Sequence, residues 1–454
     1  MYTILGAGLS GISIADHLAK KNMPYVVIEA KAHGGGHIYS ELVDGFVWDE
    51  GPHVSFTAHE YVKTWLEKNA EDQYLEYAPK PANYHQQSWI PHPAQANLYA
   101  IPQQLREQCI ADLISVRDAF PADFSPKNYK EWIDYAFGET FANVFAAVYT
   151  KKYWTMEAEQ LSTDWIGKRV YFPEVKDMVE SAHGPLQKQT HYISTVRYPS
   201  HGGFYTYVKK IEKQLNIQYN KKLRFISFEK KELQFCDGSS GTYENLISTL
   251  PLPLLIANSD APEHIKVQAK KLKCSQVLLI NVVVNHPAPV DNHWIYVYDE
   301  QYYSTRINFT ELLSPTNGVE GKSGIQVEVY FSDYHPLQRA VEDIECEVLN
   351  ELVEMKLIRA AEDISSSHRK WIDWANVIFD TQRRAAQEQV LNWLESKGLA
   401  READDLLPMT EWTEKAPQAL GSIILAGRFA QWKYYWTDDC IMRGKYISEQ
   451  LCLK

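Results

Sequence analysis

Three glycines that follow the first apolar run place the tightest constraint on the fold of this chain. The run Tyr2–Leu5 is followed by Gly6, Gly8 and Gly11 in the spacing G-x-G-x-x-G, and residues 12–20 then show an amphipathic helical pattern. In such a turn the first glycine permits the tight bend, the second lets the backbone approach a pyrophosphate, and the third lets the helix pack on the strand. The helix N-terminus then faces the phosphates with its positive end. The sequence therefore predicts a Rossmann-type site for a dinucleotide.

An acidic residue completes this pattern. The second apolar run, Tyr25–Ile28, ends in Glu29, where a carboxylate can accept hydrogen bonds from the ribose hydroxyls of an adenosine. Leu9 and Ser10 lie between the second and third glycines, so we expect them to contact the same cofactor. Strand, glycines, helix, strand and acid in this order are more specific than the glycines alone, but they do not distinguish NAD from FAD.

Length, charge and cysteine usage exclude several classes of protein. A chain of 454 residues with 45% hydrophobic and 13% aromatic residues can form two or three domains with ring-lined pockets. A formal charge of -12 argues against binding to nucleic acid. The six cysteines form no C-x-x-C pair, which indicates neither a zinc site nor a disulfide framework, and no apolar stretch has the length of a membrane span. We therefore expect a cytoplasmic enzyme without a metal ion, a leader sequence or an integral membrane segment.

A second glycine cluster favours FAD over NAD. Gly34, Gly35, Gly36 and His37 follow shortly after Glu29. This cluster resembles the second pyrophosphate motif of flavoproteins of the amine oxidase and glutathione reductase type. The resemblance implies non-covalently bound FAD, with Gly35, Gly36 and His37 among its contacts.

Near the C-terminus, a glycine and an arginine resemble the flavin motif of the same superfamily. Gly427 and Arg428 follow the apolar run 423–426, which predicts a strand. By this resemblance the arginine approaches the flavin end of the cofactor, together with the N-terminus of the next helix, where Asp439 lies. A surface ion pair is the alternative role for Arg428.

The hydrophobic pattern divides the chain into three parts. Apolar residues at three- and four-residue spacing dominate residues 57–185, which predicts helices, whereas β-rich runs within residues 274–331 predict an antiparallel sheet. The expected fold class is α/β, with a Rossmann-type FAD-binding domain, a helical insertion and an antiparallel-sheet substrate domain. The expected boundaries are 1–75 with 186–260 and 415–454 for the discontinuous FAD-binding domain, 76–185 for the helical insertion on the substrate side, and 261–414 for the substrate domain.

Several separated motifs resemble the UDP-galactopyranose mutase family. The segment DGFVWDEGPHV is similar to the one that carries the flavin-side histidine of that family, which implies this position for His53. The segments WIGKRV and YSTRI are similar to those of its two diphosphate-binding arginines, which implies Arg169 and Arg306. Two guanidinium forks suit a diphosphate because each can donate bidentate charge-assisted hydrogen bonds. A structural histidine and two salt-bridge arginines are the alternatives.

Aromatic residues extend the resemblance, with some departures. Tyr149 and Trp154 resemble the nucleotide-side aromatic residues of shorter family members, where a ring can stack on uracil, and Tyr434 resembles a tyrosine that reaches the phosphates in longer members. Ordinary helix packing is the alternative for Tyr149 and Trp154. Ser304 stands where the family has a tyrosine, and Trp436 stands where the shorter members have an acidic residue. The identity of the sugar and of the base therefore stays open.

The resemblance implies an FAD-dependent nucleotide-sugar mutase in polysaccharide biosynthesis. Reduced flavin would act as the nucleophile at the anomeric carbon of a nucleotide sugar, and ring opening and reclosure would convert a pyranose into a furanose without net redox change. Arg169 and Arg306 would hold the diphosphate, and His53 would orient the flavin or its loop. Two alternatives stay open, a net FAD oxidoreductase of the amine oxidase or protoporphyrinogen oxidase type and a flavin-binding protein without chemistry. The acidic charge also permits a homodimer.

Overall fold

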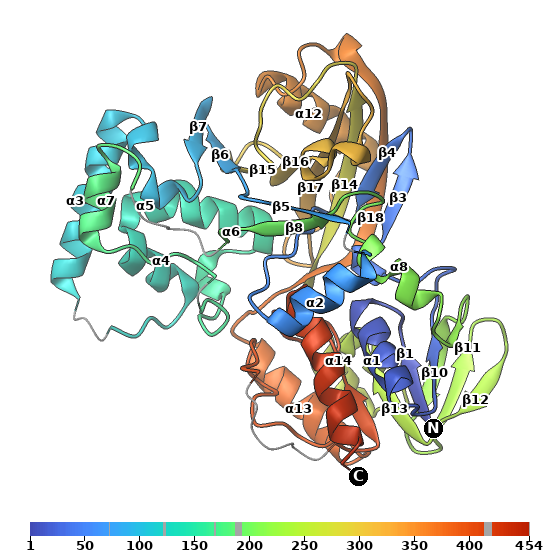
Figure 1. Cartoon of the computed structure of the whole chain (residues 1–454). Helices are drawn as coiled ribbons and strands as arrows, with labels where there is room; N and C mark the ends of the chain where they lie inside the picture. Colours follow the sequence, from blue (N-terminus) through green and yellow to red (C-terminus); the bar gives the residue numbers. More distant parts are fainter. Residues whose placement is uncertain (72, 121–123, 168, 187–192, 413–419, 454) are drawn as a thin grey trace.

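A five-stranded parallel sheet contains the first strand of the chain. The computed structural model describes residues 1–71, 73–120, 124–167, 169–186, 193–412 and 420–453. The strands of this sheet lie in the order β19 (Ile423–Leu425), β13 (Asn245–Ser248), β1 (Tyr2–Leu5), β2 (Tyr25–Ile28) and β9 (Ile217–Gln218), and every neighbouring pair is parallel. Helices α1 (Leu9–Lys20) and α14 (Thr437–Leu451) lie side by side against it (Figure 1). This topology confirms the predicted Rossmann-type fold.

The core of this sheet follows from the apolar pattern of its strands and helices. Ile4, Val27 and Ile247 of the sheet form one buried cluster with Ile14 of α1 and Ile447 of α14. Burying each such side chain contributes about 2 kcal/mol to the free energy of unfolding. This packing holds the N-terminus of α1 at the carboxyl ends of the parallel strands, where ligands bind in sheets of this kind.

A second sheet, of seven strands, lies beside the first one (Figure 1). Its strands lie in the order β18 (Ile364–Val377), β14 (Cys274–Val284), β17 (Ser323–Phe331), β16 (Arg306–Phe309), β15 (Trp294–Val297), β6 (Pro81–His85) and β7 (Ser88–Pro91). Neighbouring strands are antiparallel, as predicted, except for the parallel pair of β15 and β6. Helix α12 (Val341–Glu354) packs on this sheet, with Val348 and Leu352 buried in the same cluster as Ile280 and Val327.

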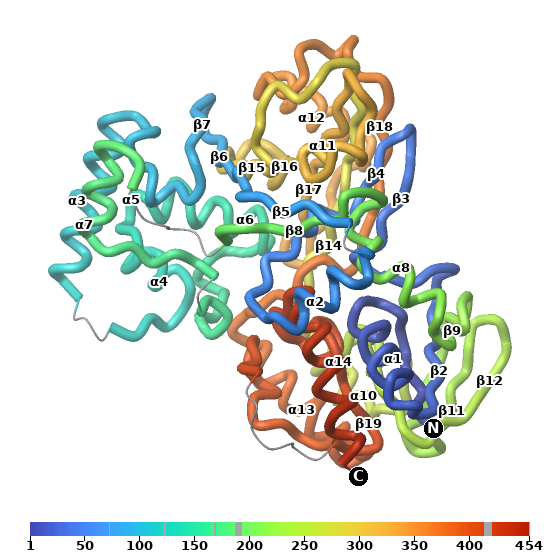
Figure 2. The backbone as a smooth tube through the Cα atoms, viewed as in Figure 1, coloured from blue at the N-terminus to red at the C-terminus, as the bar shows by residue number. Residues whose placement is uncertain are grey.

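Helices from residues 103–181 form a separate group at one side of the molecule (Figure 1). They are α3 (Gln103–Ala119), α4 (Tyr129–Phe137), α5 (Glu139–Phe141), α6 (Ala147–Trp154) and α7 (Val175–Ser181), and a π-helical turn at Ala142–Ala146 joins α5 to α6. Phe137, Phe141 and Phe145, at the predicted four-residue spacing, are buried among them. Figure 2 shows that the chain enters and leaves this group through β5 (Tyr74–Tyr77) and β8 (Val196–Pro199), which pair with each other.

The β6–β7 hairpin is the main difference from the sequence prediction, which expected helices in this part of the chain. The two strands flank Gln86 and Gln87, whose φ angles are 46° and 64°. A two-residue hairpin loop of this kind normally carries Asn-Gly or Asp-Gly because both positions need a positive φ. Two glutamines give no such signal, and the hairpin was therefore missed. The division of the chain into three domains at the boundaries given above stays a prediction.

The remaining elements connect these parts. They are β3 (Ser40–Val43), β4 (Phe46–Asp49), α2 (Glu60–Asn69), α8 (Thr206–Glu212), β10 (Leu223–Ser227), β11 (Glu232–Phe235), β12 (Ser240–Thr242), α9 (Leu252–Ala257), α10 (Glu263–Ala269), α11 (Thr310–Leu313) and α13 (Arg383–Glu395). Within the described ranges, no helix combines the length and the apolar character that crossing a membrane requires. The same residues contain no group of three or more His, Cys, Asp or Glu side chains arranged to hold a metal ion.

Candidate active site

Two glycine-rich loops meet at the carboxyl ends of β1 and β2. The backbone N–H of Gly35 donates to the carbonyl of Ala7 over 2.8 Å, and a Cβ on Gly36 would lie 2.9 Å from the Cα of Gly8. Gly36 also has a φ of 58°, which favours glycine. The absence of side chains thus lets two stretches of backbone approach each other closely. Backbone N–H groups gathered in this way, beside a helix N-terminus, suit a diphosphate.

The turn after β1 is fixed by a close helix contact and by a carboxylate. A Cβ on Gly11 would lie 2.0 Å from the carbonyl oxygen of Gly6, so α1 can approach this closely only with glycine. Glu29 accepts hydrogen bonds from the backbone N–H groups of Ala7 and Lys31, both at 2.7 Å. Gly11 and Glu29 therefore support the loops, and they do not line the cavity described below.

A buried glutamate lies beside the second glycine loop. The carboxylate of Glu50 lies 3.0 Å from the Lys370 amine, 3.5 Å from Nδ1 of His37 and 3.8 Å from the Lys31 amine. Burial alone would raise the pKa of Glu50, but these three basic side chains lower it to about 2. Glu50 is therefore ionised at neutral pH and holds three basic groups at the cavity wall.

The C-terminal glycine packs against the first glycine turn, and the arginine beside it contacts β18. A Cβ on Gly427, whose φ is 99°, would lie 2.4 Å from Oγ of Ser10. Nη2 of Arg428 donates to Oδ1 of Asn376 over 2.8 Å. Nε of Arg428 is buried and has no hydrogen-bond partner among the described residues. A buried donor without an acceptor indicates a site for a further group.

All these loops open into one cavity of about 1170 Å³. Typical small-molecule pockets measure roughly 300–1,000 Å³, so this cavity can hold a dinucleotide together with a second ligand. Of the predicted cofactor contacts, the following line it: Gly6, Gly8, Leu9, Ser10, Gly35, Gly36, His37, Gly427 and Arg428. The paired glycine loops and the unpartnered guanidinium donor fit FAD at this end of the cavity.

His53 lies on the same cavity, after β4. Its Nδ1 donates to the carbonyl of Gly51 over 2.9 Å, and its ring lies 5.6 Å from that of Phe204. Burial lowers the pKa of His53 to about 4, despite this hydrogen bond. The imidazole is therefore neutral at neutral pH, with Nε2 as an acceptor. Such a group can orient a neighbouring donor, and the orienting role toward the flavin or its loop stays a prediction.

Arg306 is held by an ion pair across two strands. Its Nε and Nη2 donate to the two carboxylate oxygens of Glu328 at 2.7 and 2.6 Å, and the β16–β17 register places these residues opposite each other. The hydroxyl of Tyr330 donates to the same carboxylate over 2.9 Å. Burial opposes the charge of Arg306, but Glu328 raises its pKa well above the usual range. A charged, fixed guanidinium thus lines the cavity.

Arg169 reaches the cavity from a different segment. Its guanidinium carbon lies 4.6 Å from the ring centroid of Tyr434 and 4.3 Å from that of Trp436. Nη2 donates to the carbonyl of Tyr434 over 2.8 Å, and Nη1 contacts the sulfur of Met409. Trp436, a departure from the family pattern, therefore supports the arginine through a cation–π contact. Arg169, Arg306 and Tyr434 all line the one cavity.

Tyr149 and Trp154 both touch the cavity, but to different extents. Tyr149 is partly exposed, and its ring stacks on that of Tyr153 at a centroid distance of 5.8 Å. Trp154 is only 4% exposed, and its ring packs against those of Trp165 at 5.0 Å and Tyr434 at 5.6 Å. Trp154 therefore contributes mainly to core packing, whereas Tyr149 presents more of its surface to a ligand.

Asp439 does not line the cavity. Its carboxylate accepts from the backbone N–H of Trp436 at 2.8 Å and from Nε1 of Trp412 at 2.9 Å, which caps α14. Burial raises the pKa of Asp439, and neighbouring Asp438 raises it further. Asp439 thus holds Trp436 in place at the start of α14, and its predicted contact with the cofactor stays a prediction.

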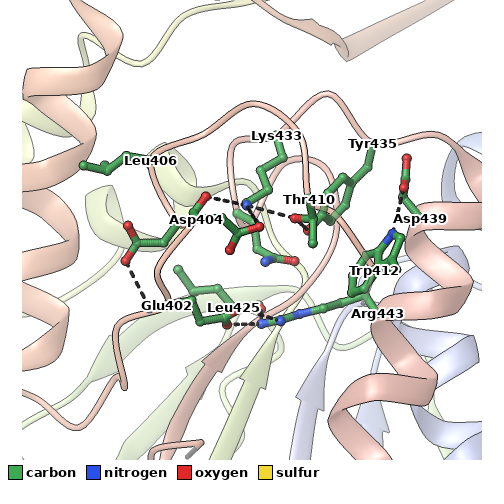
Figure 3. Close-up of polar contacts among 12 residues, drawn as sticks. Glu402, Asp404, Leu406, Thr410, Trp412, Leu425, Lys433, Tyr435, Asp439 and Arg443 are labelled. Atoms are coloured by element: carbon green, nitrogen blue, oxygen red, sulfur yellow. Dashed lines mark hydrogen bonds and ion pairs between the residues drawn. The ribbon is translucent and has the colours of Figure 1, made fainter. Parts of the chain in front are cut away.

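A buried polar network fixes the segment that carries Tyr434 (Figure 3). The Lys433 amine donates to the carbonyl of Asp404 at 2.6 Å and to the hydroxyl of Thr410 at 2.9 Å, and it lies 3.0 Å from the Asp404 carboxylate. Arg443 donates to both carboxylate oxygens of Glu402 at 2.6 and 2.8 Å. Burial lowers the pKa of Lys433. Residues 402–412 are thereby fastened to the C-terminal segment next to the cavity.

Sequence reasoning missed several residues of the cavity wall, namely Glu328, Asn376, Tyr153, Tyr296 and Lys370. A signal existed for Glu328, because the strand GIQVEVYF places Gln326, Glu328 and Tyr330 on one face of an otherwise apolar run. Polar residues at alternate positions of a buried strand indicate a polar site. The other residues come from α6, β15 and β18 and gave no such pattern.

Fold and site together define a flavoprotein with an FAD-binding fold of the amine oxidase type. Residues 9–452 match the family model of flavin-containing amine oxidoreductases, and the chain belongs to this family. The family is one of flavin-dependent oxidoreductase-type enzymes, and its cofactor agrees with the FAD predicted from the two glycine motifs.

Individual relatives point to more than one chemistry. The chain is 29% identical over 164 residues to a probable UDP-galactopyranose mutase of Klebsiella pneumoniae, covering 35% of this chain and 42% of that protein. It is 25% identical over 138 residues to a chloroplastic protoporphyrinogen oxidase of Nicotiana tabacum, covering 29% of this chain and 24% of that protein. A crystal structure of reduced UDP-galactopyranose mutase superposes with a TM-score of 0.88 at 22% identity, over 99% of this chain and 93% of that one. The structural likeness extends over nearly the whole chain, whereas the alignments with the two curated relatives cover less than half of each.

Proposed function

We propose that the chain is an FAD-dependent nucleotide-sugar pyranose/furanose mutase. The proposal depends above all on Arg169 and Arg306, which come from distant segments and line the same cavity as the glycine loops. Two guanidinium groups beside a flavin site suit a diphosphate, because each can donate charge-assisted hydrogen bonds to phosphate oxygens. The likeness to a UDP-galactopyranose mutase in sequence and in fold supports this choice of substrate class.

The side chains of the cavity then have distinct roles. When bound and reduced, FAD would supply the nucleophile that displaces the diphosphate from the anomeric carbon. Arg306, fixed by Glu328, would balance the negative charge that develops on the leaving diphosphate, and Arg169 would do so from the other segment. Neutral His53 would orient the flavin or its loop through Nε2.

The lining of the substrate end supports a further step, the exclusion of water. The cavity is lined by Tyr149, Tyr296 and Tyr298. The ring centroid of Tyr149 lies 5.5 Å from that of each of the other two tyrosines. Rings packed in this way leave little room for solvent and can stack on a base or a sugar. Tyr434, beside Arg169, would add its hydroxyl to the phosphate contacts.

A net oxidoreductase is the second candidate function. One feature favours it: both arginines already have partners in the protein, since Glu328 pairs with Arg306 and two aromatic rings cover Arg169. An aromatic cavity with compensated charges also suits an apolar substrate, and the tobacco protoporphyrinogen oxidase is a relative in sequence. Such an enzyme would consume oxygen or another electron acceptor in proportion to product.

Anaerobic titration separates the two candidates. The flavin is reduced with dithionite, and UDP and UDP-galactose are added while the flavin spectrum and the sugar products are followed. A furanose product formed with only catalytic reductant supports the mutase, and binding without product redirects the search to other nucleotide sugars. No binding, with stoichiometric use of an acceptor, supports the oxidoreductase.

Two arginine variants sharpen this test. Arg306→Lys keeps a cation beside Glu328 but loses the fork, so the Kd for UDP should rise about tenfold or more. Arg369→Lys is the matched control. Arg369 lies on β18, its guanidinium lies 2.8 Å from the carboxylate of Glu342, and it does not line the cavity. Equal UDP affinity in both variants would remove Arg306 from the diphosphate site.

The cellular context is also part of the proposal. We infer a cytoplasmic enzyme that supplies furanose units for polysaccharide biosynthesis and that forms a homodimer. Light scattering after size-exclusion chromatography tests the dimer, and fractionation of cells that express the chain tests the location.

A further inference from the structure

A bulge at the end of β18 places an asparagine between the two ends of the cavity. In the β14–β18 ladder, Ser275 pairs with Asn376 and Val277 pairs with Ile372, so two steps along β14 correspond to four along β18. The extra residues of β18 bend the strand at this point. Residues 373–376 all line the cavity, and Asn376 is itself 5% exposed.

One oxygen of this asparagine receives two donors from different parts of the fold. Oδ1 of Asn376 accepts from Nη2 of Arg428 at 2.8 Å and from the hydroxyl of Tyr153 at 3.1 Å. An amide oxygen has two lone pairs, so both are used. The orientation of the amide follows from the chemistry, because an arginine offers only donors and must face the oxygen.

The two donors belong to the two halves of the cavity. Arg428 follows the glycine of the C-terminal cofactor motif, and Tyr153 lies on α6 among the rings of Tyr149 and Tyr330, at 5.8 and 5.1 Å. The backbone N–H of Asn376 donates to Oγ of Ser275 over 3.2 Å, which fixes the asparagine to the neighbouring strand. The amide is therefore a rigid link between a cofactor-side cation and a substrate-side aromatic wall.

We propose that Asn376 is a positioning residue that couples the FAD site to the substrate wall. By sharing one acceptor, Arg428 and Tyr153 are held in fixed positions relative to each other, so a change at either donor is transmitted to the other. The proposal rests on the proposed FAD site but not on the choice between a mutase and an oxidoreductase. No sequence motif singled out Asn376, because its neighbours Arg428 and Tyr153 lie 52 and 223 positions away.

Binding of FAD to the apoprotein tests the coupling without any substrate. Asn376→Leu keeps the approximate shape but removes the acceptor, so the Kd for FAD should rise about tenfold because Arg428 loses its fixed position. Tyr153→Phe should raise this Kd about threefold in the wild-type background and leave it unchanged in the Asn376→Leu background. Additive effects in the double variant would overturn the proposal.

The variant Asn376→Asp allows a second test, the midpoint potential of the flavin, which does not depend on a loss of packing. The carboxylate keeps both hydrogen bonds but adds a negative charge beside Arg428, which disfavours further negative charge on the bound flavin. The midpoint potential of the flavin should therefore become more negative, as measured by an anaerobic redox titration. An unchanged potential would show that this position does not act on the cofactor.

Tyr149→Phe is the matched control for the tyrosine. Its ring stacks on Tyr153 from the same helix, but no hydrogen bond joins Tyr149 to Asn376 within the described structure. FAD affinity should stay at the wild-type value in Tyr149→Phe, and a loss equal to that of Tyr153→Phe would contradict a relay through Asn376. If UDP fails to bind the wild-type protein, the mutase proposal falls, while these FAD measurements still decide on Asn376.

Discussion

Replacing Gly36 with alanine should weaken FAD binding through a contact between the two glycine loops. The new Cβ would lie 2.9 Å from the Cα of Gly8, whereas non-bonded carbon atoms prefer about 3.5–4.0 Å. The loops must therefore move apart by roughly 0.6 Å. Both loops supply the backbone N–H groups that suit the diphosphate, so this movement lengthens hydrogen bonds to the cofactor.

The expected size of the effect follows from one such bond. Losing a single charge-assisted hydrogen bond costs about 2 kcal/mol of binding free energy, which corresponds to roughly a 30-fold higher Kd for FAD. The alanine must also adopt a φ near 58°, and this strain lowers the free energy of unfolding by about 1 kcal/mol. The strain is present with and without FAD, so it should not change the Kd.

Gly238→Ala provides the matched control. Gly238 has a φ of 83°, and a Cβ there would meet no atom within 4 Å, so the variant has the strain without the steric contact. Apoprotein of each variant is titrated with FAD while tryptophan fluorescence is followed, and the two Kd values are compared. Wild-type affinity in Gly36→Ala would refute the role of the loop contact, and equal losses in both variants would assign the effect to backbone strain.

Three further predictions concern buried charges. Burial raises the pKa of Asp49 to about 6, whereas the pKa of an aspartate in an unfolded chain is about 4. The folded state therefore binds the proton more tightly than the unfolded state. The free energy of unfolding should fall by up to about 3 kcal/mol as the pH rises from about 4 to 6. Urea unfolding at a series of pH values should show this slope in the wild type and a flatter curve in Asp49→Asn. The side chain of Lys433 is 1% exposed and that of Asp404 is 28% exposed. Asp404→Asn leaves the buried Lys433 amine without its ion-pair partner and should lower the free energy of unfolding by about 3 kcal/mol. Lys433→Met leaves only the more exposed carboxylate of Asp404 unpaired and should lower it by about 1 kcal/mol. Equal urea midpoints would contradict this asymmetry. Arg306→Ala should destabilise the protein by about 3 kcal/mol because Glu328 stays buried without its partner, and adding Glu328→Gln should restore part of the melting temperature in calorimetry; no recovery would contradict the ion-pair argument.

The parts of the fold that the sequence predicted well are those with local, repeated signals. The strand, glycines and helix at residues 2–20 carry the pattern of a Rossmann turn, and the sheet topology confirms it. The antiparallel sheet was also predicted from residues 274–331, because its strands β14 and β17 are long and rich in β-branched residues. The longest strand, β18, lies outside that range. The β6–β7 hairpin was missed because Gln86 and Gln87 adopt a positive φ without the residues that usually signal it.

The candidate site was predictable where a residue belongs to a motif and not where packing decides. The glycines, His53 and the two arginines come from motifs, and the structure brings His53, Arg169 and Arg306 to one cavity. Their assignment to FAD and a diphosphate stays a prediction. Asn376 and Glu328 owe their positions to a strand bulge and to cross-strand pairing, which depend on contacts between residues far apart in the sequence.

The strand order of the parallel sheet has a consequence for folding during synthesis. Strand β19 pairs with β13, and Gly427 and Arg428 follow directly after it. The glycine turn after β1 is therefore synthesised long before Gly427 and Arg428, which complete the cavity. Until β19 emerges from the ribosome, β13 has an unpaired edge, and such non-local pairing is slow to form. The FAD site that we propose can therefore form only after β19 has paired with β13, so FAD would stabilise the nascent protein only from that stage.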